Sequence, residues 1–267
     1  MRYYVVSDIH GFYTEFRRAL KDAGFDDDKS PCKVIVCGDL FDRGREATQL
    51  QSYILQLMHE DRIILIRGNH EDLFQELVEA DRGMAYQHHI SNGTYDTALQ
   101  LTGYDPVMAK IKNFDFAEEA KRTPYYQKIM PAMKDYYETA NYVFVHGWVP
   151  GFFNKFGYNY FSDWRESSAQ EWNAARWLNG MACIPATLED KTIVCGHWHA
   201  SYGHSRIEER GSEFGPDADF TPYIAPGIIA MDACTAQSGF VNCVVIDDDT
   251  TDTGSEALYD FIMTECQ

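Results

Sequence analysis

The chain has 267 residues, of which 45% are hydrophobic, and its 23 basic and 41 acidic residues give a formal net charge of −18 at pH 7. This composition is typical of a globular chain with one or two domains, and the acidic surface argues against binding to nucleic-acid backbones or anionic membranes. No apolar run is long enough to cross a membrane, and the seven cysteines form no CxxC pair. We therefore expect a cytoplasmic protein with no nucleic-acid or membrane partner.

Short apolar runs alternate with helical patterns over the first 70 residues. The runs at 3–6, 33–37 and 62–66 are rich in β-branched residues, as strands buried on both faces are. Residues 12–24 and 45–60 between them place their apolar side chains along one helical stripe. This order predicts a β-α-β-α-β arrangement and a layered α/β fold.

The pattern changes after residue 70. Residues 72–138 are rich in Ala, Glu, Lys, Met and Tyr, which predicts a helical insertion within a single domain spanning 1–267. Residues 206–227 form a long polar segment punctuated by Gly and Pro, and loops of this length are often functional. Strand-like runs resume at 142–145, 192–195, 228–231 and 240–246.

Five polar clusters directly follow five of the predicted strands. They read SDIHG (7–11), CGDLFDRG (37–44), RGNHED (67–72), VHGW (145–148) and CGHWHA (195–200). Taken singly, each has an ordinary explanation as a helix cap or a turn. Loops at the strand ends of an open α/β sheet converge on one place, however, so we expect these side chains to meet.

The side chains in these clusters are those of a metal site. Carboxylates, an amide oxygen and several imidazoles together suit Mn²⁺, Fe or Zn²⁺, whereas Mg²⁺ or Ca²⁺ alone does not call for several imidazoles. One catalytic metal takes three or four protein ligands, so a larger set predicts two divalent metal ions. Asp39 is the expected bridge between them, because it follows a central strand. The candidate ligands are Asp8, His10, Asp39, Asn69, His146, His197 and His199.

The ordered motifs DIHG, GDLFDRG, GNHE, HGW and GHWH resemble those of the calcineurin-like metallophosphoesterases. GDLFDRG and RGNHE resemble the phosphoprotein phosphatase branch of that family, especially its bacterial and bacteriophage members. The resemblance extends from residue 4 to about residue 246. It implies two β-sheets packed together and flanked by helices, and a binuclear centre with Mn²⁺ as the first choice of metal and Fe or Zn²⁺ as alternatives.

The resemblance also implies a role for each motif residue. His70 is the general acid that protonates the leaving oxygen, Asp42 orients His70, and Arg43 binds the substrate phosphate. A histidine has a suitable pKa for the first role, and a guanidinium matches phosphate oxygens in the last. For the metals it implies that the first is bound by Asp8 and His10, the second by Asn69, His146 and His197, and both by Asp39.

Two positions are less well defined by the resemblance. The phosphatase branch commonly has one histidine where this chain has GHWH, whereas in the wider superfamily the second histidine reaches the first metal. His199 is therefore either a metal ligand or a residue turned to solvent or phosphate. A second phosphate-binding arginine is expected between 147 and 192, and WNAAR loosely resembles a Trp-Asn-Arg element, which favours Arg176 over Arg165.

The resemblance implies a phosphatase that hydrolyses phosphomonoesters by attack of a metal-bridged hydroxide. Phosphorylated protein (on Ser, Thr or Tyr) is the leading substrate, ahead of small phosphoesters. The alternative is a symmetrical diadenosine tetraphosphatase or another nucleotide phosphohydrolase or phosphodiesterase, since that branch shares the motifs. A non-catalytic scaffold is disfavoured because His70 and the six core ligands are all present.

Overall fold

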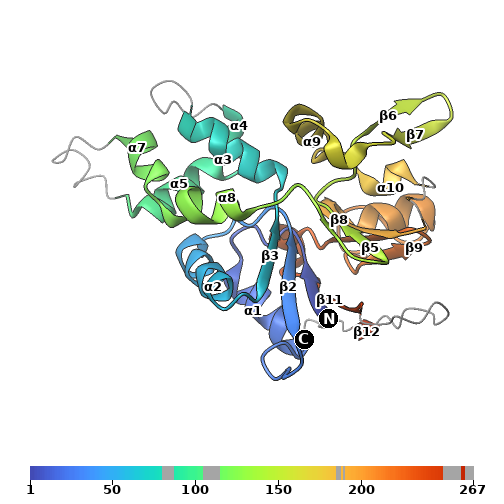
Figure 1. Ribbon diagram of the computed structural model, residues 1–267, viewed down its shortest axis with the longest axis horizontal. Helices are drawn as coiled ribbons and strands as arrows, with labels where there is room; N and C mark the ends of the chain where they lie inside the picture. The colour runs from blue at the N-terminus through green and yellow to red at the C-terminus, as the bar shows by residue number, and fades with distance from the viewer. Residues whose placement is uncertain (80–86, 105–114, 185–187, 189, 249–259, 262–267) are drawn as a thin grey trace.

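The computed structural model of the chain describes residues 1–79, 87–104, 115–184, 188 and 190–248, and the backbone of 260–261. Its centre consists of two five-stranded sheets, with helices arranged around them (Figure 1). Within the described residues, no helix combines the length and the apolar character needed to span a bilayer. The six described cysteines are free thiols.

The first sheet carries the β-α-β-α-β unit expected from the sequence. Its central strands are parallel, β11 runs antiparallel to β1, and the strand order is β12-β11-β1-β2-β3. Each crossover between the parallel strands is one amphipathic helix, as predicted. The elements are β1 (Arg2–Val6), α1 (Tyr13–Asp22), β2 (Cys32–Cys37), α2 (Ala47–His59), β3 (Ile63–Ile66), β11 (Val244–Asp247) and β12 (Asp260–Phe261).

The second sheet has the order β4-β5-β8-β10-β9, with three parallel strands between two antiparallel edges. Its strands are β4 (Tyr137–Glu138), β5 (Tyr142–Phe144), β8 (Thr192–His199), β9 (Tyr223–Ala225) and β10 (Ile228–Asp232). β8 is longer than the apolar run predicted, because it continues past a register shift opposite Ala230 and Asp232 and pairs as far as His199. The GHWH motif is therefore the end of a strand rather than a loop.

Three buried clusters define the layers. Along β2, Ile35 and Cys37 face the second sheet, whereas Val34 and Val36 face the helices outside the first sheet. The inner cluster contains Tyr3, Phe144 and Ile229 from the two sheets, and a third cluster covers the outer face of the second sheet. This alternation confirms the predicted layered fold of two packed sheets flanked by helices.

The segment between β3 and β4 is mainly helical and lies to one side of the sheets (Figure 1). Its buried residues Phe74, Leu77, Ala98 and Tyr125 join the same hydrophobic cluster as α1 and α2. The first helix of this segment, α3, begins at Asn69, so the predicted site residues Asn69 and His70 lie in its first turn. The elements are α3 (Asn69–Glu79), α4 (Gln87–Ser91), α5 (Thr94–Thr102), α7 (Phe116–Lys121), the π-helix η2 (Tyr125–Ile129) and α8 (Met130–Ala132).

The segment between β5 and β8 forms a hairpin and a short helical unit that the sequence pattern did not predict. The large apolar side chains of this hairpin, Phe152, Phe153 and Phe156, are exposed. Its residues therefore do not follow the alternation of buried apolar and exposed polar positions from which a strand is predicted. A capping box of Ser168 and Glu171 starts α9. The elements here and beyond are β6 (Gly151–Asn154), β7 (Gly157–Tyr160), η3 (Trp164–Glu166), α9 (Ala169–Ala175), α10 (Gly180–Cys183), η4 (Gly203–Ile207) and α11 (Thr235–Ser238).

Candidate metal centre and active site

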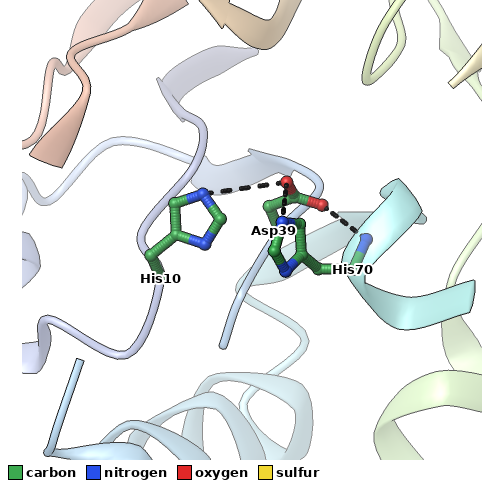
Figure 2. Close-up of side chains that lie close together, drawn as sticks. All are labelled: His10, Asp39 and His70. Carbon is green, nitrogen blue, oxygen red and sulfur yellow. Dashed lines mark hydrogen bonds and ion pairs between the residues drawn. The ribbon is translucent and has the colours of Figure 1, made fainter. Parts of the chain in front are cut away.

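The polar clusters after β1, β2, β3 and β5 meet the end of β8 at one place, with Asp39 at its centre. One group of metal-capable side chains contains His10, Asp39 and His70, and a second contains Asp39, His146 and His197. Within each group the ligand atoms lie within 4.8 Å of one another. In Figure 2 the imidazoles of His10 and His70 approach the same oxygen of Asp39. Both Nε2 atoms are 3.8 Å from Asp39 Oδ2.

Unusual backbone conformations aim these side chains. The described residues include ten non-glycine residues with positive φ, and six of them are predicted site residues. Such conformations cost on the order of 1–3 kcal/mol each and persist only where the surrounding structure imposes them. The tight turns after β1 and β2, and the irregular end of β8 at His197, are therefore shaped for the site. The six residues are Asp8, His10, Asp39, Asp42, Arg43 and His197.

In the second group, the side chains of Asp39, Asn69, His146 and His197 direct acceptor atoms towards one another. His146 bonds the carbonyl of Cys37 through Nδ1 at 2.8 Å, so its proton lies on Nδ1 and its Nε2 faces Asn69 Oδ1 at 2.8 Å and Asp39 Oδ1 at 3.3 Å. His197 Nδ1 faces the same Asn69 oxygen at 3.0 Å, and its ring also bonds the backbone of Trp177. Four acceptor atoms that converge in this way fit a cation.

The charges around Asp39 point to the same conclusion. Burial raises the pKa of Asp39, but His146 and His70 outweigh it and hold that pKa well below its ordinary range. Burial lowers the pKa of His146, but Asp39 outweighs it and the pKa rises to about 10. Burial and His146 lower the pKa of His197 to about 3. The positive charge of the neighbouring imidazoles thus keeps the Asp39 carboxylate ionised, and a metal ion held at the same place would supply the same stabilisation.

Asp8 and His10 complete the other side of the centre. The carboxylate of Asp8 is buried and accepts the backbone N–H of His197 at 3.0 Å, and burial, followed by the nearby Asp232, raises its pKa. His10 bonds the Phe41 carbonyl through Nδ1 at 3.0 Å, so its Nε2 keeps a lone pair. Burial is the main cause that lowers the pKa of His10, which favours the neutral imidazole that binds metals.

His70 forms a buried pair with Asp42 beside this centre. The His70 Nδ1 atom lies 2.6 Å from Asp42 Oδ2, and the hydroxyls of Thr94 and Thr97 bond the same carboxylate at 2.6 and 2.8 Å. Burial lowers the pKa of His70, but Asp39 and Asp42 outweigh it, so the net shift is upward. The two threonines come from α5 and carry no local signal in the sequence.

Arg43 lies across the two imidazoles of the first group. Its Nη1 is 2.6 Å from His10 Nε2, and its Nη2 is 3.3 Å from His70 Nε2. Trp177, which the sequence analysis did not select, lies beside the second group: its indole is 48% exposed and its ring centre is 5.7 Å from that of His197. An arginine and an open aromatic ring therefore border the centre.

Glu71 ties together the strand ends that carry the site. Its Oε2 accepts the backbone N–H groups of Gly68 and Asp39 at 2.7 and 3.0 Å, and its Oε1 accepts that of Leu40 at 3.1 Å. The Tyr125 hydroxyl donates to Oε1 at 3.2 Å. This buried carboxylate therefore joins the ends of β2 and β3.

Two predicted site residues lie outside both groups. His199 Nε2 is 3.0 Å from Glu213 Oε1, because the polar 206–227 segment brings a carboxylate to it, and its ring packs on Phe214. Arg176 is buried between Asp72, 2.7 Å away, and Asp135. Arg176 lines a cavity of about 550 Å³ together with Asp72, Glu76 and Glu79 of α3. The roles suggested for His199 and Arg176 therefore stay predictions.

Comparisons with known proteins agree with this architecture. The sequence model of the calcineurin-like phosphoesterase family matches residues 1–219. Symmetrical bis(5'-nucleosyl)-tetraphosphatases of Buchnera aphidicola and Nitrosospira multiformis are 38% and 35% identical to this chain over 71 residues. That stretch is 27% of this chain and 24% of each relative, so the match spans about a quarter of their length.

Solved structures show the same fold. A cold-active protein tyrosine phosphatase matches 92% of this chain and 73% of its own with a TM-score of 0.55 and 18% identity. The cold-active protein-tyrosine phosphatase of a psychrophilic Shewanella matches 93% of this chain and 76% of its own, with a TM-score of 0.50 and 16% identity. Since the family model covers most of the sequence, the chain belongs to the calcineurin-like phosphoesterase family.

Proposed function

We propose that this protein is a metal-dependent phosphatase that hydrolyses phosphomonoesters, with phosphorylated protein as its leading substrate. The observation that carries the proposal is the buried His70–Asp42 pair, which stands beside the Asp39-centred ligand groups with Arg43 between His10 and His70. This arrangement combines a proton donor, a phosphate-binding cation and a metal centre in one place.

Asp39 belongs to both ligand groups, so it would help to hold each of two divalent ions in the proposed centre. Their ligands are Asp8 and His10 on one side and Asn69, His146 and His197 on the other, and His199 is left out because it bonds Glu213. When bound, such ions acidify a water molecule and neutralise the charge of the phosphoryl group. Imidazoles and carboxylates together favour Mn²⁺, Fe or Zn²⁺, and we propose Mn²⁺.

His70 is the proposed general acid. Its Nδ1 proton is held by Asp42, so the Nε2 atom is the one that faces Asp39 and Arg43 and is available to donate to a leaving oxygen. Thr94 and Thr97 fix the Asp42 carboxylate, which keeps the imidazole oriented. Arg43 has two N–H groups directed at the same region, a fork that suits two phosphate oxygens.

A nucleotide phosphohydrolase is the second candidate. The curated relatives that match residues of this chain at 35–38% identity are named bis(5'-nucleosyl)-tetraphosphatases, although the match covers only a quarter of their length. The half-exposed Trp177 beside His197 would suit a nucleobase as well as the ring of phosphotyrosine. We place the phosphatase first because Arg43 spans His10 and His70, an arrangement that suits one terminal phosphoryl group.

A substrate panel on Mn²⁺-reconstituted protein tests the proposal. The panel contains a phosphoserine peptide, a phosphotyrosine peptide, diadenosine tetraphosphate and bis-4-nitrophenyl phosphate, with His70→Asn as the inactive reference and His59→Asn as the matched surface control. The proposal predicts the highest kcat/KM on a phosphopeptide. A higher kcat/KM on diadenosine tetraphosphate would show instead that the protein is a nucleotide phosphohydrolase. Turnover of bis-4-nitrophenyl phosphate alone would refute the assignment as a phosphomonoesterase.

A further inference from the structure

A second histidine–carboxylate group lies on the helical segment, apart from the centre described above. It consists of Glu76 on α3 and the neighbouring His88 and His89 on α4, and one ligand atom from each lies within 4.8 Å of the other two. The Nε2 atoms of His88 and His89 are 3.4 and 3.8 Å from the two oxygens of Glu76. The two rings are 4.0 Å apart between centres, with 40° between their planes.

These distances match the spacing of ligands around a metal better than that of a hydrogen-bonded ion pair. A tetrahedral Zn²⁺ with ligands about 2.0–2.1 Å away places its ligand atoms about 3.3 Å from one another. A charge-assisted N–H···O⁻ bond is shorter, about 2.7–2.9 Å. His88 Nε2 is 3.4 Å from Oε1 of Glu76, which is close to that ligand spacing, and His89 Nε2 is 3.8 Å from Oε2 of the same carboxylate. Because all three ligand atoms lie within 4.8 Å of one another, small side-chain adjustments would let them share one ion.

The surroundings of the group suit a metal that enters from solvent. The side chains of Glu76 and His88 are 52% and 46% exposed, whereas His89 is fully buried. The His89 ring also bonds the backbone of Leu73, which fixes its orientation. Burial, followed by the neighbouring His88, lowers the pKa of His89, which favours its neutral, metal-binding form.

We propose that Glu76, His88 and His89 bind one divalent transition-metal ion, Zn²⁺ in particular, separately from the active centre. Two imidazole nitrogens and one carboxylate oxygen form a borderline donor set that favours Zn²⁺, Co²⁺ or Ni²⁺ over Mg²⁺ and Ca²⁺. Three protein ligands leave the fourth tetrahedral position to water. The site does not depend on the proposed phosphatase activity.

An ion at this site would join α3 to α4 and so brace the helices behind Asp42 and Arg43. α4 leads through Gly93 into α5, and a side chain on Gly93 would collide with the backbone nitrogen of Arg43. The next residue, Thr94, bonds the Asp42 carboxylate. Zinc binding at Glu76, His88 and His89 should therefore raise the midpoint of thermal unfolding.

Zinc stoichiometry tests the proposal directly. The full-length protein and the variants His88→Gln and Glu76→Gln are dialysed to equilibrium against Zn²⁺, and bound zinc is measured by mass spectrometry. His59→Gln is the matched control, since His59 is an exposed histidine on α2. We expect each cluster variant to bind about one ion fewer than the wild type and the control. Equal zinc in His88→Gln and in the wild type would overturn the proposal.

A second comparison separates this site from the active centre. Asp39→Asn is expected to lose the ions of the centre, and the zinc that remains on it should disappear when His88→Gln is added. Because both cluster variants change exposed side chains, they should fold normally. If Asp39→Asn and the double variant hold the same amount of zinc, the helical site does not exist, whatever the protein hydrolyses.

Discussion

Replacing Glu71 with glutamine tests how the fold holds the strand ends that carry the metal centre. The carboxylate accepts three backbone N–H groups, from Gly68, Asp39 and Leu40, and the hydroxyl of Tyr125. Glutamine has nearly the same shape but brings an NH₂ group in place of one oxygen. One of the two oxygen positions must therefore become a donor that faces other donors.

The structure decides which orientation costs less. If the NH₂ group replaces Oε2, the amides of Gly68 and Asp39 both lose their acceptor, which costs about 2–6 kcal/mol at about 1–3 kcal/mol for each buried group. If it replaces Oε1, only the amide of Leu40 loses its acceptor, because the Tyr125 hydroxyl can turn and accept. The second orientation should prevail, with a loss of about 1–3 kcal/mol.

Urea unfolding of the metal-free protein measures this loss. Tyr125→Phe is the matched control, since it removes one hydrogen bond and leaves every backbone amide its acceptor; we expect it to cost about 1 kcal/mol. Glu71→Gln should unfold at a lower urea midpoint with an unchanged slope. A free energy of unfolding for Glu71→Gln equal to that of the wild type would refute the role of this carboxylate in joining β2 to β3.

Three further predictions concern chemistry, specificity and pH. His70→Asn should retain its metal but slow hydrolysis of alkyl phosphates by about 10²–10⁴-fold, with a smaller effect on 4-nitrophenyl phosphate, whose leaving group needs no proton; equal losses on both would contradict a general acid. Trp177→Ala should raise KM for phosphotyrosine peptide more than for phosphoserine peptide, because the indole is half-exposed beside His197; unchanged KM ratios would remove Trp177 from the site. The hydrogen bond from Arg165 lowers the pKa of Glu138 from 4.5 to about 2, so this stabilisation is present above pH 4.5 and is lost as the pH falls towards 2. Glu138→Gln should therefore lower the thermal midpoint at pH 7 more than at pH 3, and an equal decrease at both would contradict this.

The sequence predicted the parts of the site that lie in short motifs. Asp8 with His10, and Asp39 with Asp42, each belong to one turn after one strand, so their approach follows from strand order in the sheets. The layered α/β fold followed from apolar runs that are buried on both faces, such as β2, whereas the pairing of two sheets followed only from the family resemblance. Local patterns were sufficient wherever position along a strand determines position in the fold.

The sequence could not predict partners that come from distant segments. Thr94 and Thr97 reach Asp42 across 52 and 55 positions, and nothing in α5 marks them. Glu213 bonds His199, and Asp72 is one of two carboxylates that engage Arg176. These contacts depend on how the helical and loop segments pack against the sheets. Amino-acid composition does not show which residues of those segments face the site.

Metal-dependent turnover by matched proteins tests the central claim most directly. The rate of 4-nitrophenyl phosphate hydrolysis is measured for metal-stripped wild type and for Asp39→Asn, each with and without added Mn²⁺, together with bound metal per chain. The account predicts turnover by the wild type only when Mn²⁺ is restored, with about two ions in its centre, and neither turnover nor those ions in Asp39→Asn. Turnover that survives metal removal, or Asp39→Asn that binds as much Mn²⁺ as the wild type, would contradict it.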